Sequence, residues 1–221
     1  MNAQSTSRNL INKIEEWDQK VFLSLYKSGF SKKIKQAAKI YSFFGNYYFW
    51  GILWFSLAIY GYITKEYSLF VLLTGGFIQS MSLHMFIRYK IVNRNRPFIT
   101  LKNHGVKQHD RSIRENKSFP SGHVTFIMFF GLLFSFYFQS DLILIIFIGA
   151  DIIMAISRII LGVHYPLDTI FGFVFGFVFY YLFVGLTYVY WVEICYGLGE
   201  FFSPKIYYWS YYFSNWLKTI F

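Results

Sequence analysis

Histidine, arginine and aspartate residues occur in this sequence in three short clusters. The clusters are residues 94–97 (Arg-Asn-Arg-Pro), residues 120–123 (Pro-Ser-Gly-His), and the set Ser157, Arg158, His164 and Asp168. Phosphoryl transfer needs these residue types, because a phosphate ester is dianionic near neutral pH and its transition state carries further charge on the phosphoryl oxygens. Fixed cations, backbone N–H donors, a nucleophile and an acid must therefore meet in one place. The three clusters together predict such a site.

Arg96 and Arg158 are the candidate phosphate ligands, since a planar guanidinium matches phosphate oxygens with two parallel hydrogen bonds. Ser121 and Gly122 stand where an apolar stretch begins, and the free N–H groups at a helix N-terminus bind anions. We therefore expect these residues to surround the phosphate.

His164 and His123 divide the remaining chemistry. His164 and Asp168 are four residues apart, which would place them on one face of a helix. The carboxylate could then hold one imidazole nitrogen and direct the other at phosphorus. His164 is the candidate nucleophile, which forms a phosphohistidine intermediate. His123 is the candidate acid, which protonates the leaving oxygen and later activates water.

The elements that must position these clusters are membrane helices. The 221-residue chain is 55% hydrophobic and only 14% charged, which excludes an ordinary soluble domain. Five apolar stretches are candidates to cross a bilayer, which takes about 20 residues of helix. They are residues 40–64, 67–87, 119–140, 142–157 and 169–192. The predicted fold class is all-α, a polytopic membrane helix bundle with about five transmembrane spans.

Interfacial segments are expected on both sides of the spans. Residues 14–25 repeat apolar side chains at helical spacing, which predicts an amphipathic helix at the membrane surface that ends near Gly29. The last residues are rich in Tyr and Trp but carry charges and a proline, which is typical of a second interfacial segment. The chain then divides into an N-terminal region 1–39, a transmembrane domain 40–192 with a polar loop 88–120, and an aromatic tail 193–221.

Five spans would place the N-terminal region, the polar loop and the junction at 158–168 on one face of the membrane. Residues 1–40 carry eight basic and three acidic residues and residues 88–120 carry nine and two, so this face has a net charge of +12, against −2 for the rest. The positive-inside rule alone would make this face cytoplasmic. Because an anion site accounts for part of the charge, we instead predict a multi-pass protein of the cytoplasmic membrane whose site faces outward.

In this order, the three clusters resemble the signature of the type-2 phosphatidic acid phosphatase superfamily, which is related to the vanadium haloperoxidases. The second and third motifs match at every defined position, and the span layout matches over residues 67–190. The first motif departs from the family pattern, because Tyr89 stands where the family has a lysine. Either neighbour, Arg88 or Lys90, could supply the missing charge, or the phosphate site has one ligand fewer. Lys90 is included among the candidate phosphate ligands.

The resemblance implies a membrane lipid phosphatase in which His164, His123 and Asp168 have the roles given above. The substrate would be the phosphomonoester or pyrophosphate of a lipid: phosphatidic acid, phosphatidylglycerophosphate, a polyprenyl pyrophosphate such as undecaprenyl pyrophosphate, or lipid A. We expect no cofactor and no nucleic-acid partner. We also expect no metal ion, because no carboxylate cluster suited to hard cations lies on this face. A phosphotransferase that uses the same phosphohistidine and a non-catalytic lipid-binding relative are the alternatives. The sequence leaves the oligomeric state open.

Asp151 is an ionisable residue deep in a predicted span, outside the clusters. A charge at this depth usually faces the bundle interior, and Arg158 follows seven residues later on nearly the same helical face. Asp151 is therefore predicted either to support Arg158 from within the span or to pack as a neutral, hydrogen-bonded group. Of the other histidines, His84 is expected to form hydrogen bonds near the membrane surface, and His104 and His109 to be solvated.

Overall fold

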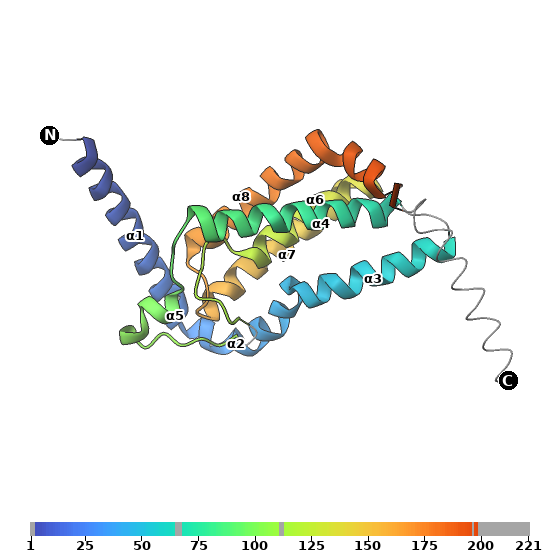
Figure 1. Ribbon diagram of the computed structural model, residues 1–221. Helices are drawn as coiled ribbons and strands as arrows, with labels where there is room; N and C mark the ends of the chain where they lie inside the picture. Colours follow the sequence, from blue (N-terminus) through green and yellow to red (C-terminus); the bar gives the residue numbers. More distant parts are fainter. Residues whose placement is uncertain (1–2, 65–67, 111–112, 196, 199–221) are drawn as a thin grey trace, which may run out of the picture.

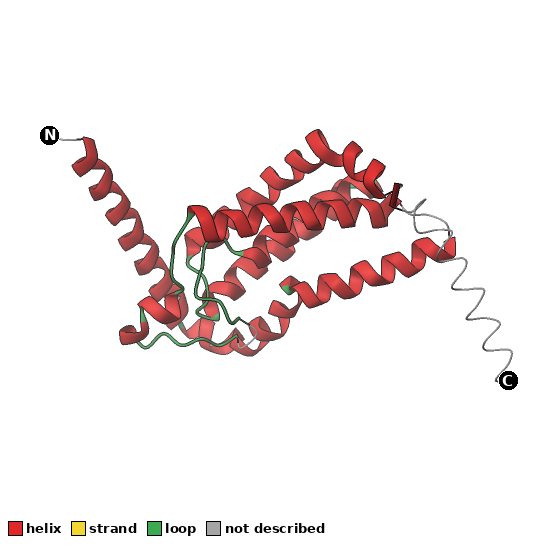
Figure 2. Ribbon diagram, in the orientation of Figure 1, coloured by secondary structure: helices red, strands yellow, loops and turns green. Residues whose placement is uncertain are grey.

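The computed structural model describes residues 3–64, 68–110, 113–195 and 197–198. Helices joined by loops make up this part of the chain, and an isolated antiparallel bridge links Asn95 to Lys117 (Figure 1, Figure 2). The predicted all-α class is therefore confirmed. Most of the predicted C-terminal interfacial segment lies outside the described residues.

Each of the five predicted spans forms a helix. They are α3 (Tyr47–Thr64), α4 (Ser68–Phe86), α6 (Gly122–Phe138), α7 (Asp141–Ile160) and α8 (Pro166–Leu182). Among the described residues, three helices are long and apolar enough to cross a membrane: Ser68–Ile91, Asp141–Ile160 and Pro166–Cys195. The apolar parts of α3 and α6 are shorter. The chain is a membrane helix bundle.

The first span begins later than the sequence predicts. The helix α2 (Gly29–Tyr41) continues into a short helical turn, η1 (Ser42–Gly45), and the chain leaves helical geometry at Asn46. Asn46 Oδ1 accepts a hydrogen bond from Tyr48 N at 3.1 Å and so satisfies an N–H group in the first turn of α3. Residues 40–46, predicted to lie in the span, thus precede the helix α3.

Two helices form the N-terminal region. The first, α1 (Ala3–Lys27), runs at a steep angle to the bundle and packs against its polar end through the buried Phe22 (Figure 1). Its other side exposes apolar residues such as Trp17, which is typical of a helix at a membrane surface. The helix ends near the predicted position, where Ser28 Oγ accepts a hydrogen bond from Ser31 N at 3.0 Å and caps α2.

α6 is the central helix, and it packs against α4, α7 and α8 (Figure 1). Close packing requires glycine at two points. A Cβ at Gly176 of α8 would lie 2.6 Å from Met128 Cβ, and a Cβ at Gly131 would lie 2.4 Å from Phe147 Cβ. Because α6 and α8 approach so closely, their N-termini lie side by side at the polar end of the bundle.

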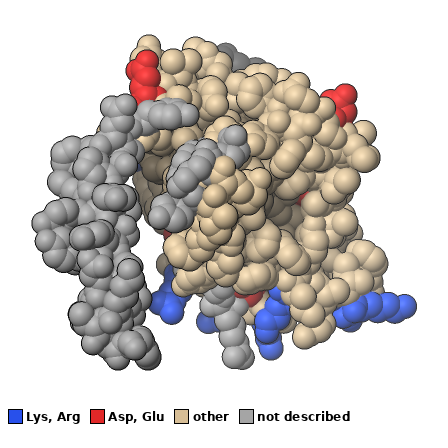
Figure 3. All heavy atoms as spheres, turned by 90° about the vertical axis from the view of Figure 1, so that its right-hand side faces the viewer, with Lys and Arg blue, Asp and Glu red and all other residues tan. Residues whose placement is uncertain are grey.

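The two ends of the bundle differ in charge. The polar loop, the start of α6 and the junction of α7 with α8 lie at the end where α1 and α2 pack (Figure 1). Seen from the opposite end, the described surface is mostly uncharged, and Lys and Arg side chains are confined to its lower edge (Figure 3). The two N-terminal helices and the polar loop, which carry most of the basic residues, pack at the other end (Figure 1).

Candidate active site

The three sequence clusters meet at the polar end of the bundle. The end of α4 with the turn η2 (Ile87–Ile91), the loop after it, the start of α6 and the junction of α7 with α8 all contribute. Contacts join the clusters directly. Arg96 Nη1 lies 3.0 Å from His164 Nε2, and Ser121 N donates a hydrogen bond to Asp168 O at 2.9 Å. Residues from all three motifs therefore form one site.

His164 is buried in the turn between α7 and α8. Its Nδ1 lies 3.7 Å from Asp168 Oδ2, while its Nε2 faces Arg96. His164 precedes the helix, and Pro166 begins α8. Asp168 Oδ2 accepts a hydrogen bond from Tyr165 N at 2.8 Å, which satisfies an N–H group at the helix start. The capping turn, rather than a shared helix face, thus brings the carboxylate to the imidazole.

The surroundings of His164 favour its neutral form. Burial lowers the pKa of His164 well below 6.5, and the charges of Arg96, Arg158 and Arg88, together with His123, lower it further. A neutral imidazole keeps a free lone pair near neutral pH, as a nucleophile requires.

Backbone carbonyl groups of two segments hold Arg96. Its Nε donates to Glu115 O at 2.8 Å, and its Nη1 donates to Val163 O at 3.0 Å. Burial lowers the pKa of Arg96 to about 9, and the neighbouring Arg88 and Arg158 contribute to this shift. Buried cations close to one another are unfavourable unless an anion joins them. Their arrangement therefore favours the binding of an anion.

Arg88 lies in the cluster, and Lys90 does not. Arg88 is 7% exposed, donates from Nη2 to Pro120 O at 2.6 Å, and pairs through Nη1 with Glu115 Oε2 at 2.9 Å. Lys90 and Tyr89 are exposed. The π-helical turn η2 changes the direction in which successive side chains point at the end of α4. Of the two candidate replacements for the family lysine, the structure brings only Arg88 to the site.

At the start of α6, Ser121, Gly122 and His123 border the same site. Ser121 is fully buried and precedes a first turn whose N–H groups have no partners within the helix. Gly122 contacts a residue of α4, since a Cβ at Gly122 would lie 3.1 Å from His84 Nε2. His84 is buried one helical turn before Arg88 and so belongs to this site. Its position within an apolar span gave no sign of this.

Two residues not identified from the sequence hold Arg158, which is fully buried at the end of α7. Arg158 Nη1 donates to Asp110 Oδ2 at 2.7 Å and also to Ser42 Oγ. Ser42 Oγ in turn donates to Asp110 Oδ2 at 2.9 Å. The only signal in the sequence is that Asp110 is one of two acidic residues in a loop with nine basic ones.

Buried polar atoms without a hydrogen-bond partner are concentrated at this site. Among the described residues they include Arg88 Nε, Ser121 Oγ, His123 Nε2, Arg158 Nε and Nη2, and His164 Nδ1. Native proteins leave few such atoms, so each requires a physical explanation. Several oxygen atoms on one ligand would accept hydrogen bonds from the donors among them, which fits a phosphate group.

Asp151 lies apart from the site residues. Its carboxylate is fully buried in α7, and neither oxygen has a hydrogen-bond partner among the described residues. The hydrogen bonds of Arg158 go to Asp110 and Ser42 instead. The support of Arg158 by Asp151 therefore stays a prediction.

Both loop histidines also lie outside the cluster. His104 is exposed, whereas His109 is partly buried against the N-terminal helices. His109 Nε2 lies 3.1 Å from Tyr26 Oη and 3.2 Å from Lys35 Nζ. Within the described part of the chain, no group of three or more His, Cys, Asp or Glu side chains is arranged to hold a metal ion.

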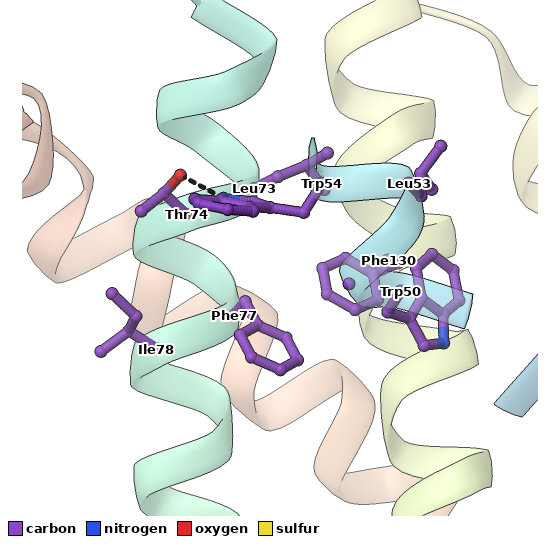
Figure 4. A pocket seen from close by; sticks show the side chains of 9 residues that line it. Trp50, Leu53, Trp54, Leu73, Thr74, Phe77, Ile78 and Phe130 are labelled. Carbon is purple, nitrogen blue, oxygen red and sulfur yellow. Dashed lines mark hydrogen bonds between the residues drawn. The ribbon is translucent and has the colours of Figure 1, made fainter. Parts of the chain in front are cut away.

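An apolar cavity of about 230 Å³ lies between α3, α4 and α6 (Figure 4). Trp50 of α3 stacks on Phe130 of α6, with 4.3 Å between ring centroids. Trp54 Nε1 donates to Thr74 Oγ1 at 2.8 Å and so joins α3 to α4. The other lining residues are Gly51, Leu53, Leu73, Phe77 and Ile78. These walls suit a hydrocarbon chain.

Two solved structures are similar to this fold. Aquifex aeolicus LpxE shares 18% identity and a TM-score of 0.55, over 74% of this chain and 92% of that chain. The first transmembrane PAP2 type phosphatidylglycerolphosphate phosphatase from Bacillus subtilis shares 19% identity and a TM-score of 0.60, over 79% of this chain and 86% of that chain. At these identities, the likeness shows the fold alone.

The sequence itself carries the family signature. No curated protein matches it significantly. The family model of the PAP2 superfamily matches residues 66–191, a segment that holds all three motifs and more than half of the chain. The protein therefore belongs to the PAP2 superfamily.

Proposed function

We propose that this protein is an integral membrane phosphatase that hydrolyses the phosphomonoester or pyrophosphate of a lipid through a phosphohistidine on His164. One observation carries the proposal. His164 Nε2 lies 3.0 Å from Arg96 Nη1, beside two further buried arginines, Arg88 and Arg158, that keep nitrogen atoms without a partner. Three guanidinium groups can bind a dianionic phosphate and the additional charge of its transition state.

In the first step, the phosphate binds among the three arginines and the N–H groups at the start of α6. His164 Nε2 attacks phosphorus, and the bond between phosphorus and the leaving oxygen breaks. Asp168 Oδ2, 3.7 Å from Nδ1, stabilises the positive charge that the imidazole gains. His123 gives a proton to the leaving oxygen, which releases the dephosphorylated product.

In the second step, water attacks the phosphohistidine. His123 accepts a proton from the water, the bond between nitrogen and phosphorus breaks, and inorganic phosphate leaves. His164 returns to its neutral form. Because the arginines supply the positive charge that the phosphoryl oxygens require, we propose that no metal takes part and that activity persists in EDTA.

The apolar cavity supports a lipid substrate, because it offers an acyl or prenyl chain a place between α3 and α4. One structural relative is described as a phosphatidylglycerolphosphate phosphatase, which also supports a lipid phosphate. Phosphatidic acid, phosphatidylglycerophosphate, polyprenyl pyrophosphates and lipid A phosphates are the substrates to compare. The positive charge of the polar loop favours a pyrophosphate or another multiply charged headgroup.

Phosphate release from a panel of these lipids tests the proposal. We expect the purified protein to release inorganic phosphate from at least one of them, and His164→Ala to release none. With a radiolabelled aryl phosphate, whose leaving oxygen needs no proton, His123→Ala should accumulate acid-labile phosphate on the protein, because the second step lacks its base. Full activity in His164→Ala would refute the proposal. Transfer to an added lipid acceptor would identify a phosphotransferase, and no turnover of any substrate would favour a non-catalytic lipid-binding relative.

We further propose that the site faces the outside of the cytoplasmic membrane. Cysteine labelling in intact cells tests this, in a background in which Cys195→Ser removes the natural thiol. Asn103→Cys lies at an exposed position in the polar loop, and Thr64→Cys lies at the opposite end of the bundle. An impermeant maleimide should label Asn103→Cys in intact cells and Thr64→Cys only after permeabilisation. The reverse pattern would place the site in the cytoplasm.

A further inference from the structure

Asp18 is a buried carboxylate on the surface helix α1. Asp18 is 0% exposed, whereas Glu15 and Glu16 of the same helix are exposed. Burial of a charge costs free energy unless partners compensate for the lost water, and a buried ion pair rarely stabilises a fold more than apolar side chains would. The apolar contact through Phe22 already packs α1 against the bundle. The position of Asp18 therefore needs a further explanation.

Both oxygens of Asp18 have partners beside the proposed catalytic residues. Oδ1 accepts a hydrogen bond from Leu167 N, in the first turn of α8, at 3.0 Å. Oδ2 accepts one from Arg94 Nη2 at 2.5 Å. Leu167 is the neighbour of Asp168, so Asp18 contacts the turn that carries the carboxylate facing His164.

Arg94 faces Asp168 rather than the other arginines of the site. Its described side-chain hydrogen bonds go to Asp168 and Asp18. Its Nη1 donates to Asp168 Oδ1 at 2.9 Å, and its guanidinium lies 4.2 Å from the centre of the Tyr165 ring. Burial lowers the pKa of Arg94, but Asp168 and Asp18 outweigh this effect and raise the pKa above its usual value. Arg94 is thus a fixed cation between two carboxylates, and Asp168 Oδ2 remains directed at His164 Nδ1, 3.7 Å away.

We propose that Asp18 is a positioning residue for phosphoryl transfer, acting through Arg94 and Asp168 on His164. The inference rests on the proposed role of His164 as nucleophile. By fixing the guanidinium of Arg94, Asp18 fixes the orientation of Asp168 toward Nδ1. By neutralising Arg94, it leaves the negative charge of Asp168 available to the imidazole, which becomes positive as the phosphohistidine forms.

The inference extends the catalytic unit beyond the segment that defines the family. The family match covers residues 66–191, and Asp18 lies well before it. α1 then has a second role in addition to its predicted contact with the membrane surface. Through Asp18, it contributes to the geometry of the reaction.

Asp18→Asn in the full-length protein tests the inference, because it removes the charge and keeps the shape. Glu16→Gln, at an exposed position of the same helix, is the matched control. We expect kcat to fall about 10- to 100-fold, as when groups that orient a catalytic ligand are removed. The KM should change by less than about twofold, because Asp18 does not contact the phosphate site. We expect Asp18→Glu to recover part of the loss and Glu16→Gln to match the wild type.

A wild-type kcat in Asp18→Asn overturns the inference, and so does a raised KM at unchanged kcat. If Asp18→Asn fails to fold, two other variants replace it. The double variant Asp18→Asn with Arg94→Gln also removes the buried cation that Asp18→Asn leaves unpaired. Asp18→Glu keeps the negative charge and changes only the length of the side chain. A lowered kcat in the folded variant supports the inference, and a wild-type kcat in the double variant overturns it. His164→Ala separates the two proposals. Its inactivity beside a fully active Asp18→Asn refutes only the inference, whereas its full activity refutes the proposed function.

Discussion

The ring of His123 packs directly against Gly45. A Cβ at Gly45 would lie 2.6 Å from His123 Cδ2 and 2.8 Å from His123 Cβ, closer than side chains pack. Gly45 belongs to η1, which precedes α3 and lies outside the residues of the family match. The absence of a side chain at Gly45 therefore determines how closely this turn approaches the proposed acid.

Gly45→Ala should displace His123 and lower kcat. A displacement of about 1 Å at a catalytic group can reduce the rate about 100-fold, so we expect a loss between about 10- and 100-fold. Steady-state phosphate release is the measurement, and the thermal stability of the purified protein should be measured beside it. Gly149→Ala is the control, because a Cβ at Gly149 meets no atom within 4 Å. Equal kcat in the two variants would show that His123 tolerates the change.

Arg88 and Lys90 should differ sharply in their effect on catalysis. Arg88 is buried and directed at the site, and Lys90 is exposed. Removal of one donor to a developing negative charge costs about 100- to 1,000-fold in rate, so we expect a loss of this size in Arg88→Gln. Lys90→Gln should keep nearly full activity. The opposite ranking would mean that the side chains exchange places when substrate binds.

The difference between these two residues shows what the sequence can and cannot predict. Long charge-free stretches and short motifs are local patterns, so the spans, the order of the clusters and the proximity of His164 to Asp168 could be predicted. The choice between Arg88 and Lys90 could not, because it depends on which side chain the tertiary structure buries, and Arg88 is the one that bonds to Glu115 and Pro120.

Residues that reach the site from distant segments were also beyond prediction. Asp18 bonds to Leu167 across 149 positions, and Asp110 bonds to Arg158 across 48. Neither carboxylate belongs to a motif. In the sequence, Asp18 is one of several charged residues of a predicted interfacial helix, and Asp110 is one of several in a basic loop. His84 is similar, because its role depends on the approach of α4 to Gly122. Such contacts are properties of tertiary packing rather than of local sequence.

The pKa of Arg96 predicts an alkaline limit to phosphate binding. Burial, with the nearby charges of Arg88 and Arg158, lowers this pKa to about 9. Arg96 therefore carries its charge below about pH 9 and loses it as the pH rises through that value. Competitive inhibition by inorganic phosphate, measured between about pH 7 and about pH 10, should weaken above about pH 9. Arg96→Gln should bind phosphate weakly at every pH and lose this alkaline step, whereas a step that persists in the variant would assign it to another group.

The cavity between α3 and α4 should distinguish substrates by chain length. Gly51 lines this cavity, and a Cβ at Gly51 meets no atom within 4 Å, so a larger side chain can occupy the space without a backbone clash. If the lipid chain binds there, Gly51→Leu should raise KM for a long-chain lipid phosphate about 10-fold, because the added side chain takes the volume of several methylene groups. A water-soluble, short-chain phosphate has no chain to place in the cavity, so its kcat/KM should stay unchanged. Gly149→Leu is the matched control, since its Cβ position is equally open and lies outside the cavity. Equal effects of Gly51→Leu on both substrates would mean that the lipid chain lies elsewhere on the bundle.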